Sequence, residues 1–393
     1  MPQNIGVLLR RQRLEKNWSQ EGLCKGICAV SYLSKIEQGQ VQPSKEMADA
    51  LLCRLGLTLW TEEELCRRAQ RELDEMYEKI FCYGDLELRS NSEPYFTPWI
   101  EQHKAQLFES PYLLDMLVLQ AVCDSQHGLD TFNLEEYRSH FTGRQRVLYL
   151  MCRDREEEAL EYMPCGVTFF VVGTKQTRLG NYAAAIGLLE KGFSCSSQEC
   201  NPVLMAKCKA FLGNCHSELE QWEQMEKSYQ DAQRLFRVLN DPSKEDCCDS
   251  ILYNMGATWI QRGEPEKGIE LLNQCRHIEA SHCHKMAVAH ELLGNTEQAL
   301  EWVAKGYTFT ERSERLNRMR LELVEYRLRH PDFLQQQEYA EKLKGCIDAL
   351  RNEAPVGWLR FELPWYLSYL EYSRQYKQLA EILRGFSGIN RFY

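Results

Sequence analysis

Apolar side chains recur every three or four positions along nearly the whole chain, which is the spacing of one face of an α-helix. The clearest case is residues 61–81, where Thr61 and three glutamates open the segment and an apolar seam follows. From about Trp99 onward the same period continues with few interruptions. The pattern predicts an all-α fold.

In the first 60 residues the helical pattern occurs in short segments. A first helix is expected from Ile5 to Lys16, with Leu14 among its inward-facing residues. Ser19 is a favourable N-cap for a second helix, and Tyr32 begins a third short helix that stops near Gly39. Two short helices joined by a tight turn, inside a cluster of four or five, are typical of a helix-turn-helix DNA-binding unit.

The turn and its two helices carry a specific motif, SQEGLCKGICAVSYLSKIEQGQVQPS. It is similar to the helix-turn-helix of the phage-repressor (Cro/C1) class. Within that class, the pattern G-I-C-x-x-S-x-L-S-K-I-E-x-G followed by P-S resembles the peptide-sensing regulators of the Rgg/PlcR/NprR type. The resemblance is close over about the first 60 residues and implies a structural ion pair between Arg13 and Glu37.

The third helix is the expected reading helix for double-stranded operator DNA. Leu33 and Ile36 are expected in the core, which leaves the other side chains for the major groove. Gln20 at the start of the preceding helix is expected near a phosphate. The candidate DNA contacts are Gln20, Val30, Ser31, Tyr32, Ser34 and Lys35.

A repeat becomes visible in the second half of the chain. Small residues recur at the expected crossing points of helix pairs, similar to the tetratricopeptide pattern with its 34-residue period. These anchors are Gly173, Gly213, Gly256 and Ala287, and their intervals of 40, 43 and 31 residues make the repeat degenerate. Weaker pairs are expected at Tyr112–Cys123 with Leu134–Phe141, Arg318–His330 with Gln335–Arg351, and Pro364–Tyr372 with Tyr376–Phe386. Stacked pairs predict a solenoid with a concave groove.

Three domains follow from these patterns: residues 1–60 as the helix-turn-helix head, 61–84 as a linker helix and 85–393 as the repeat body. Residues 84–98 are rich in loop-forming residues and are expected to form a boundary. In the resembled family the linker helix helps two heads to dimerise. The sequence equally allows an ordinary first helix of the body.

The first helix of each repeat is expected to line the concave groove. Asparagines there match the unpaired N–H and C=O groups of an extended peptide, because an asparagine offers one donor arm and one acceptor arm. The resembled regulators use asparagines in this way, and a nearby cation could take a peptide carboxylate. The candidate residues for a short signalling peptide are Arg178, Lys207, Asn214, Tyr253 and Asn254. Exposed polar residues without a ligand are the alternative for each.

The distribution of charge along the chain bears on whether it can bind DNA. The chain of 393 residues carries a net charge of −10, which alone disfavours a DNA partner. Residues 1–60 nevertheless hold eight basic and five acidic side chains, so the head is weakly positive and the body acidic. No apolar run is long enough for a membrane span, so we expect a cytoplasmic protein. The 17 cysteines are scattered and are expected to be mostly reduced and buried.

No catalytic motif is apparent, and no enzyme activity or cofactor is expected. The histidines around Cys283 fit no closed zinc pattern, so no metal is expected. The sequence therefore predicts a homodimeric transcriptional regulator that a signalling peptide controls through population shift. One alternative is a solenoid that binds a protein partner, and another is a solenoid that only dimerises.

Overall fold

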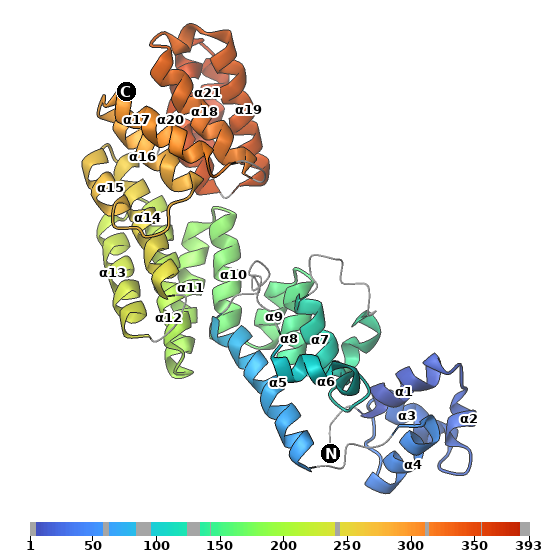
Figure 1. The fold of residues 1–393 in the computed structure, drawn as a ribbon. Coiled ribbons are helices and arrows are strands. Elements are labelled where there is room, and N and C mark those ends of the chain that lie inside the picture. The colour runs from blue at the N-terminus through green and yellow to red at the C-terminus, as the bar shows by residue number, and fades with distance from the viewer. Residues whose placement is uncertain are drawn as a thin grey trace. The chain divides into compact units, whose positions relative to one another are not determined.

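The computed structural model describes residues 5–57, 63–83, 96–123, 134–141, 143–239, 244–310, 314–354 and 356–385. The described residues form helices and no strand, which confirms the all-α prediction (Figure 1). The chain divides into two compact units, residues 1–171 and residues 172–393. The division falls within helix α10, whereas the domain limits drawn from the sequence stay a prediction.

The first unit begins with the four helices of the head and continues with a bundle that follows α5. Its helices are α1 (Ile5–Glu15), α2 (Gln20–Cys24), α3 (Val30–Glu37), α4 (Lys45–Leu55), α5 (Glu63–Tyr83), α6 (Pro98–Phe108), α7 (Leu113–Cys123), the 3₁₀ helix η2 (Leu134–His140), α8 (Gly143–Cys152) and α9 (Glu156–Tyr162).

Local signals in the sequence set the ends of the head helices. The hydroxyl of Ser19 accepts a hydrogen bond from the Gly22 N–H, and Ser44 caps α4 in the same way through the Met47 N–H. Gly56 ends α4 in the left-handed conformation with φ of 78°. At Gly6 an added Cβ would lie 1.9 Å from the carbonyl oxygen of Ile36, so only glycine lets α1 pack this closely on α3.

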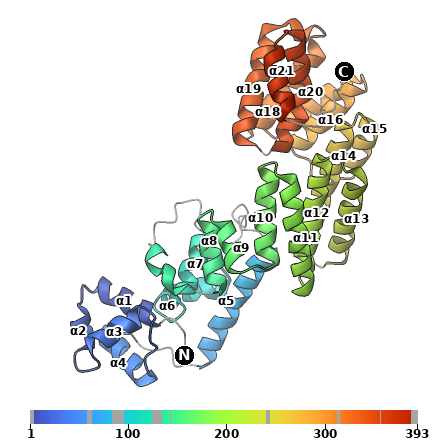
Figure 2. The ribbon, with the colours of Figure 1, turned by 180° about the vertical axis from the view of Figure 1, so that it is seen from behind.

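The second unit is a stack of antiparallel helix pairs, seen from both sides in Figures 1 and 2. Its helices are α10 (Gly166–Arg178), which crosses the division, α11 (Tyr182–Gln198), α12 (Pro202–Glu218), α13 (Trp222–Val238), α14 (Lys244–Gln261), α15 (Pro265–Leu272), α16 (Ala280–Leu292), α17 (Thr296–Tyr307), α18 (Arg315–Arg329), the 3₁₀ helix η3 (Phe333–Gln335), α19 (Gln337–Glu353), α20 (Val356–Tyr372) and α21 (Tyr376–Gly385). The first helices of successive pairs contact one another. We call the face formed by α12, α14, α16 and α18 the inner face.

Small residues lie where the two helices of a pair cross, as the repeat pattern predicts. A Cβ added at Gly213 would lie 2.5 Å from the ring of Tyr229. One added at Gly256 would lie 2.8 Å from Leu272. Both distances are shorter than a carbon contact allows, so these glycines set the separation of α12 from α13 and of α14 from α15.

The structure corrects three details of the sequence prediction. Leu14 is 48% exposed rather than inward-facing, since it lies in the last turn of α1. The helix predicted at Leu134–Phe141 is the 3₁₀ helix η2. The helix predicted to start at Pro364 starts eight residues earlier, so Pro364 lies inside α20. Phe386 and most of the predicted loop 84–98 lie outside the described residues.

Burial explains why α20 continues through its proline. A proline inside a helix costs about 3 kcal/mol because it removes one hydrogen bond and clashes with the preceding turn. Phe361, Leu363 and Trp365 are each at most 1% exposed. Burying each of these large side chains contributes about 1.5–3 kcal/mol, which together outweighs the proline.

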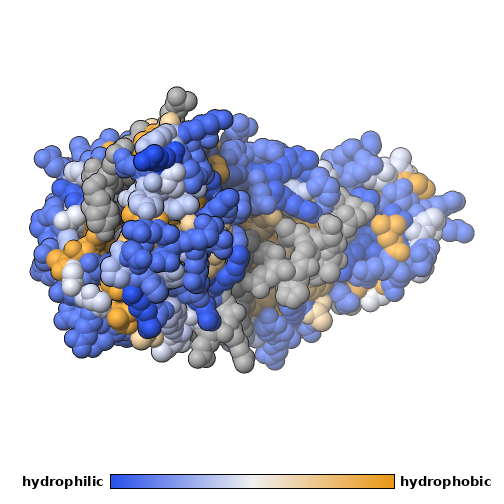
Figure 3. Space-filling model, turned by 90° about the horizontal axis from the view of Figure 1, so that it is seen from above, coloured by the Kyte–Doolittle hydropathy of each residue, from blue (hydrophilic) through white to orange (hydrophobic). Residues whose placement is uncertain are grey.

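The surface is largely hydrophilic on the face shown in Figure 3, where hydrophobic residues form small separate groups. Among the described residues, no helix is both long enough and apolar enough to cross a membrane.

Candidate functional sites

A buried ion pair holds the reading helix in the head. Arg13 of α1 donates to Glu37 of α3 through Nε at 2.7 Å and through Nη2 at 2.9 Å. Its third nitrogen, Nη1, donates to the carbonyl oxygen of Trp18 at 2.7 Å. The hydrogen bond to Glu37 raises the pKa of Arg13. Two parallel charged hydrogen bonds fix both orientation and distance, so this pair sets the position of α3 on α1.

Gln20 belongs to the same network. Its amide nitrogen donates to Oε2 of Glu37 at 2.8 Å. The residue was predicted to lie near a phosphate, and the structure gives its side chain a second task, which is to complete the coordination of Glu37. Its backbone N–H lies in the first turn of α2, where helix N–H groups point toward the solvent and favour anions.

The exposed face of α3 consists of residues predicted to contact DNA. Leu33 and Ile36 are at most 1% exposed and form the buried side of the helix, as expected. Val30 is 42% exposed, and Ser31 and Lys35 are also exposed. Tyr32 and Ser34 are half-buried. The helix therefore presents hydroxyl, ammonium and aliphatic groups on one side, which suits a groove lined with base edges.

Sequence reasoning missed two glutamines at the end of this face. The Gln38 amide donates to the Ser34 hydroxyl at 3.1 Å, and the Gln40 amide donates to Gln38 at 2.8 Å. Both glutamines are exposed. Glutamine can pair with an adenine edge through both arms, so their position just after the reading helix was the available signal.

Arg54 fixes the turn between the two short helices. Its Nη1 donates to the carbonyl oxygen of Leu23 at 2.9 Å and also to that of Lys25. These carbonyl groups end α2 and would otherwise lack helical partners. Arg54 of α4 thereby stabilises the turn that sets the orientation of α3.

In the second unit, two of the predicted peptide-binding residues lie side by side on the inner face. Asn254 of α14 donates from Nδ2 to Oδ1 of Asn214 of α12 at 3.0 Å. Tyr229 donates from its hydroxyl to the same oxygen at 2.6 Å. This arrangement directs Nδ2 of Asn214 and Oδ1 of Asn254 to other partners. One donor and one acceptor, from adjacent helices, are the set that an extended backbone requires.

Hydroxyl groups lie beside Asn214 and Asn254 and extend this polar surface along the inner face; we call them the polar row. The hydroxyls of Ser217 and Thr258 are 2.8 Å apart, again joining α12 to α14. The Thr177 hydroxyl lies 3.3 Å from the Cys215 sulfur, joining α10 to α12. Burial raises the pKa of the Cys215 thiol to about 11, so this cysteine is a neutral, unreactive group.

The remaining three predicted peptide-binding residues lie in different surroundings. Arg178 is exposed at the end of α10, whereas Lys207 is only 9% exposed. Tyr253 is half-buried beside Asn254, and burial raises its pKa. Of the two cations, Arg178 is the one open to a ligand from solvent.

The inner face also holds a buried charged cluster that the sequence did not indicate. Arg320 of α18 donates from Nε to Glu362 of α20 at 2.9 Å, and Nε2 of His284 of α16 lies 3.3 Å from the same oxygen. The Lys285 ammonium lies over the ring of Phe361. His284 and Lys285 lie on α16, the first helix of its pair, yet they are 0% and 4% exposed. They are covered by α20.

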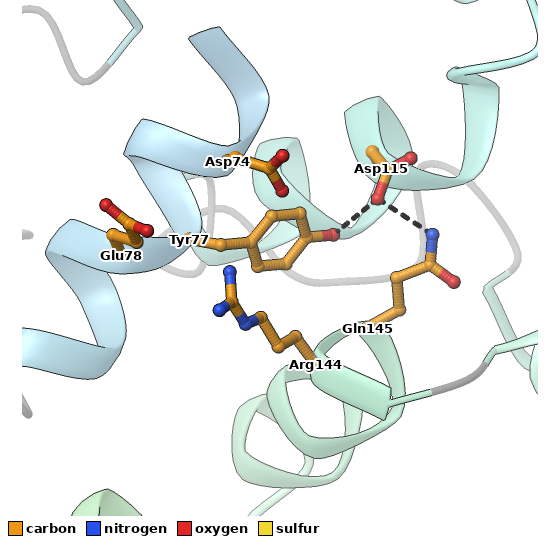
Figure 4. A pocket seen from close by; sticks show the side chains of 6 residues that line it. All are labelled: Asp74, Tyr77, Glu78, Asp115, Arg144 and Gln145. Carbon is orange, nitrogen blue, oxygen red and sulfur yellow. Dashed lines mark hydrogen bonds between the residues drawn. The ribbon is translucent and has the colours of Figure 1, made fainter. Parts of the chain in front are cut away.

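An open pocket of about 400 Å³ lies between α5, α7 and α8 in the first unit (Figure 4). Its centre is Asp115, whose Oδ1 accepts hydrogen bonds from the Tyr77 hydroxyl at 2.9 Å and the Gln145 amide at 2.8 Å. Burial raises the pKa of Asp115. These bonds attach the predicted linker helix α5 to α7 and α8, so α5 is packed against the bundle along this length.

A helix-turn-helix family model matches residues 9–59. The transcriptional activator NprA of Geobacillus stearothermophilus is 26% identical over 284 residues, which are 63% of this chain and 66% of that protein. The match thus spans just under two thirds of this relative's length. The comparisons thus show a helix-turn-helix head and a similarity to a transcriptional activator. The matched head contains the network around Glu37 and all the predicted DNA contacts.

Two solved structures are also similar. Bacillus thuringiensis PlcR, in complex with the peptide PapR7 and DNA, is 12% identical with a TM-score of 0.29. The Streptococcus dysgalactiae SHP pheromone receptor Rgg2 is 14% identical with a TM-score of 0.24. Each match covers 79% of this chain and 100% of the other. The curated relative is a transcriptional activator, which agrees with the prediction that the chain is not an enzyme.

Proposed function

We propose that the chain is a cytoplasmic transcriptional regulator that binds operator DNA as a homodimer and is controlled by a short signalling peptide. DNA binding is supported by the exposed polar face of α3, whose position in the head is fixed by the ion pair of Arg13 and Glu37. One reading helix covers only half of a palindromic site, so two heads are required. The weak positive balance of the head makes paired binding necessary for useful affinity.

The peptide part rests on the pair Asn214 and Asn254. Their direct hydrogen bond holds both amides in place before a ligand arrives, which lowers the entropy cost of binding. The polar row of Ser217 and Thr258 continues the same face. A groove for a protein partner would instead present large apolar anchors, so these residues favour a peptide backbone.

Control follows from a population shift. A peptide that binds one arrangement of the helix stack better than another shifts the balance between them. If the two arrangements hold the paired heads at different spacings, operator affinity changes by the same coupling free energy. Couplings of this kind are typically about 1–3 kcal/mol, or about 5- to 150-fold in affinity.

The experiment that tests this proposal compares the wild-type protein with the Asn254→Ala variant. Each purified protein is incubated with peptides from the medium of the producing cells, and bound peptides are identified by mass spectrometry. Operator affinity is then measured with and without the recovered peptide. We expect wild-type protein to retain a short peptide that changes operator affinity at least fivefold, and the variant to lose most of this retention.

The matched control is Asn273→Ala, which removes an exposed asparagine at the end of α15. It should retain the peptide as the wild-type protein does. Absence of any retained peptide, or a retained peptide without effect on operator binding, would contradict the proposal.

A further inference from the structure

Helix α20 occupies a position that a regular stack would leave open. In a stack of helix pairs each pair contacts its neighbours. Phe361 and Trp365 of α20 instead share one buried cluster with Ile260 of α14, Met286 of α16 and Val324 of α18. The helix therefore packs on the inner face across several pairs, rather than only on α18 and α19 beside it.

A polar contact holds the beginning of α20 to a helix far away in the sequence. Arg360 donates from Nη1 to Glu218 of α12 at 3.0 Å and also to the Glu218 carbonyl oxygen, 142 residues earlier. Its Nη2 reaches Glu220 at 3.4 Å. Gly357 allows this approach, since a Cβ there would lie 2.9 Å from the Glu218 carboxylate. We call the contact between Arg360 and Glu218 the latch.

The charged cluster lies next to the latch along α20, because Glu362 follows Arg360 by two residues. One carboxylate, that of Glu362, faces Arg320 and His284, with Lys285 beside it. Glu362 is 1% exposed, and Arg320 and His284 are fully buried. Arg320 and His284 thus meet at one carboxylate oxygen, and Lys285 packs on the neighbouring Phe361 ring.

The donors in this cluster are not all used. Nη2 of Arg320 and both ring nitrogens of His284 are buried without a hydrogen-bond partner among the described residues. A buried donor without a partner costs about 1–3 kcal/mol. A buried donor in this position is available to a further acceptor. Arg320 and His284 both meet Glu362 at Oε1, so the cluster can accept a carboxylate that engages Arg320 through both of its oxygens.

The same inner face carries the proposed peptide site. Asn254 lies on α14, which packs against α16, and α16 carries His284 of the cluster and packs in turn against α18 with Arg320. A peptide that lies along Asn214 and Asn254 would therefore point one end toward the cluster. That end meets α20, which covers the cluster in this structure.

We propose that α20 is an internal occupant of the groove, and that Glu362 stands where the terminal carboxylate of the signalling peptide binds when α20 moves away. This inference rests on the proposed function and adds the ligand chemistry: a peptide with a free C-terminal carboxylate, bound by Arg320 and His284. Binding then requires the latch to open. The apparent affinity is the intrinsic affinity reduced by the fraction of molecules whose groove is open.

The test opens the latch with the Arg360→Gln variant, which removes the charge that holds Glu218. The probe is a mixed heptapeptide library without Asp or Glu, labelled at the N-terminus, in two forms: free C-terminal carboxylate and C-terminal amide. Binding to the full chain is followed by fluorescence anisotropy. We expect the variant to bind the carboxylate library at least tenfold more tightly than the wild-type protein, with no such gain for the amide library.

A matched control variant is Arg315→Gln. Arg315 lies on α18 and pairs with Glu353 at 2.9 Å, but this pair is exposed and away from the cluster. It should leave both affinities unchanged. A second variant, Glu362→Gln, removes the internal carboxylate. It should also bind the carboxylate library more tightly than the wild-type protein does. It keeps the proposal testable if Arg360→Gln does not fold.

A third measurement uses the wild-type protein alone. Saturating carboxylate library should increase hydrogen exchange in α20, because the bound peptide displaces this helix. Equal binding of the two libraries, or unchanged exchange in α20, would overturn the inference and leave peptide control intact. Absence of binding by either library to every variant would overturn both the inference and the proposed function.

Discussion

Two buried arginine–glutamate pairs of the described residues, Arg13 with Glu37 and Arg320 with Glu362, differ in how completely their hydrogen-bonding groups are satisfied. In the head, all three guanidinium nitrogens of Arg13 have acceptors, and Gln20 adds a further donor to Glu37. On the inner face, one guanidinium nitrogen of Arg320 and both ring nitrogens of His284 lack a hydrogen-bond partner among the described residues. The first pair joins residues 24 positions apart in sequence, and the second joins residues 42 positions apart.

The difference separates a rigid part from a part that can rearrange. A buried ion pair stabilises a fold only when its geometry is good and its remaining hydrogen-bonding groups are satisfied. The head meets this condition, so α3 keeps one orientation for DNA. The inner face does not meet it, so α20 is held by an arrangement that a better ligand can replace.

The largest expected effect is that of Glu37→Ala in the head. The substitution leaves Arg13 buried without its carboxylate and should destabilise the head by about 3–5 kcal/mol. Denaturant unfolding of the full chain, followed by hydrogen exchange in α1 and α3, measures this loss. The control is Glu15→Ala, which removes an exposed partner of Arg11 and should change stability by less than about 1 kcal/mol. Equal effects of the two substitutions would show that the buried pair does not organise the head.

Lys35→Ala tests the exposed face of the same rigid part. We expect operator affinity to fall by about 1–3 kcal/mol if Lys35 reads a base edge, with stability unchanged. If it contacts a phosphate, the slope of log affinity against log salt should fall by about 0.9. Titrations at several salt concentrations distinguish these cases. Lys79→Ala, on the exposed side of α5, is the control. Wild-type affinity and salt slope in Lys35→Ala would exclude this residue from the interface.

The pH dependence of stability tests the second pair. Burial and the neighbouring cations lower the pKa of His284 well below 6.5, so the folded state keeps the ring neutral while the unfolded chain binds a proton. Stability is then fully present above about pH 6.5 and is lost as the pH falls, by at most about 1.4 kcal/mol per pH unit for one histidine. Glu218, whose pKa burial raises, acts in the opposite direction.

Comparison of the wild-type protein with His284→Asn isolates this contribution. Unfolding free energies at pH 7, 6 and 5 should fall less steeply for the variant, because asparagine does not titrate. Identical slopes for the two proteins would mean that His284 is protonated in the fold.

The smallest effect is expected from removing both charges of the second pair. Arg320→Met combined with Glu362→Met replaces the ion pair with apolar side chains of similar size. Such replacements are often neutral or stabilising, so we expect the free energy of unfolding to stay within about 1 kcal/mol or to rise. Thermal and denaturant unfolding measure it. A loss of several kcal/mol would show that the cluster stabilises the stack as strongly as Arg13 stabilises the head.

The same contrast explains what the sequence could predict. Residues 19–39 fold through local signals, namely a serine cap, turn glycines and apolar positions at helical spacing, so the reading helix was located to within two residues. The inner-face asparagines were found because the repeat period puts them on the first helix of each pair. The period also predicted the crossing glycines Gly213 and Gly256.

Long-range packing accounts for what the sequence did not show. Nothing in the local pattern of α20 indicates that Glu362 meets Arg320, or that Arg360 meets a residue 142 positions earlier. Pro364 suggested a helix start because its local cost is high, and tertiary burial outweighed that cost. The repeat pattern likewise does not show that Lys285, on the first helix of its pair, is buried against Phe361 of α20.

Hydrogen exchange of the full chain, with and without the peptide recovered from producing cells, tests the central contrast most directly. Both regions are observed in one sample. The account predicts that amides of α20 exchange faster when the peptide is bound, while amides of α1 and α3 keep their protection. Increased protection throughout α20, or a loss of protection in the head without change in α20, would contradict it.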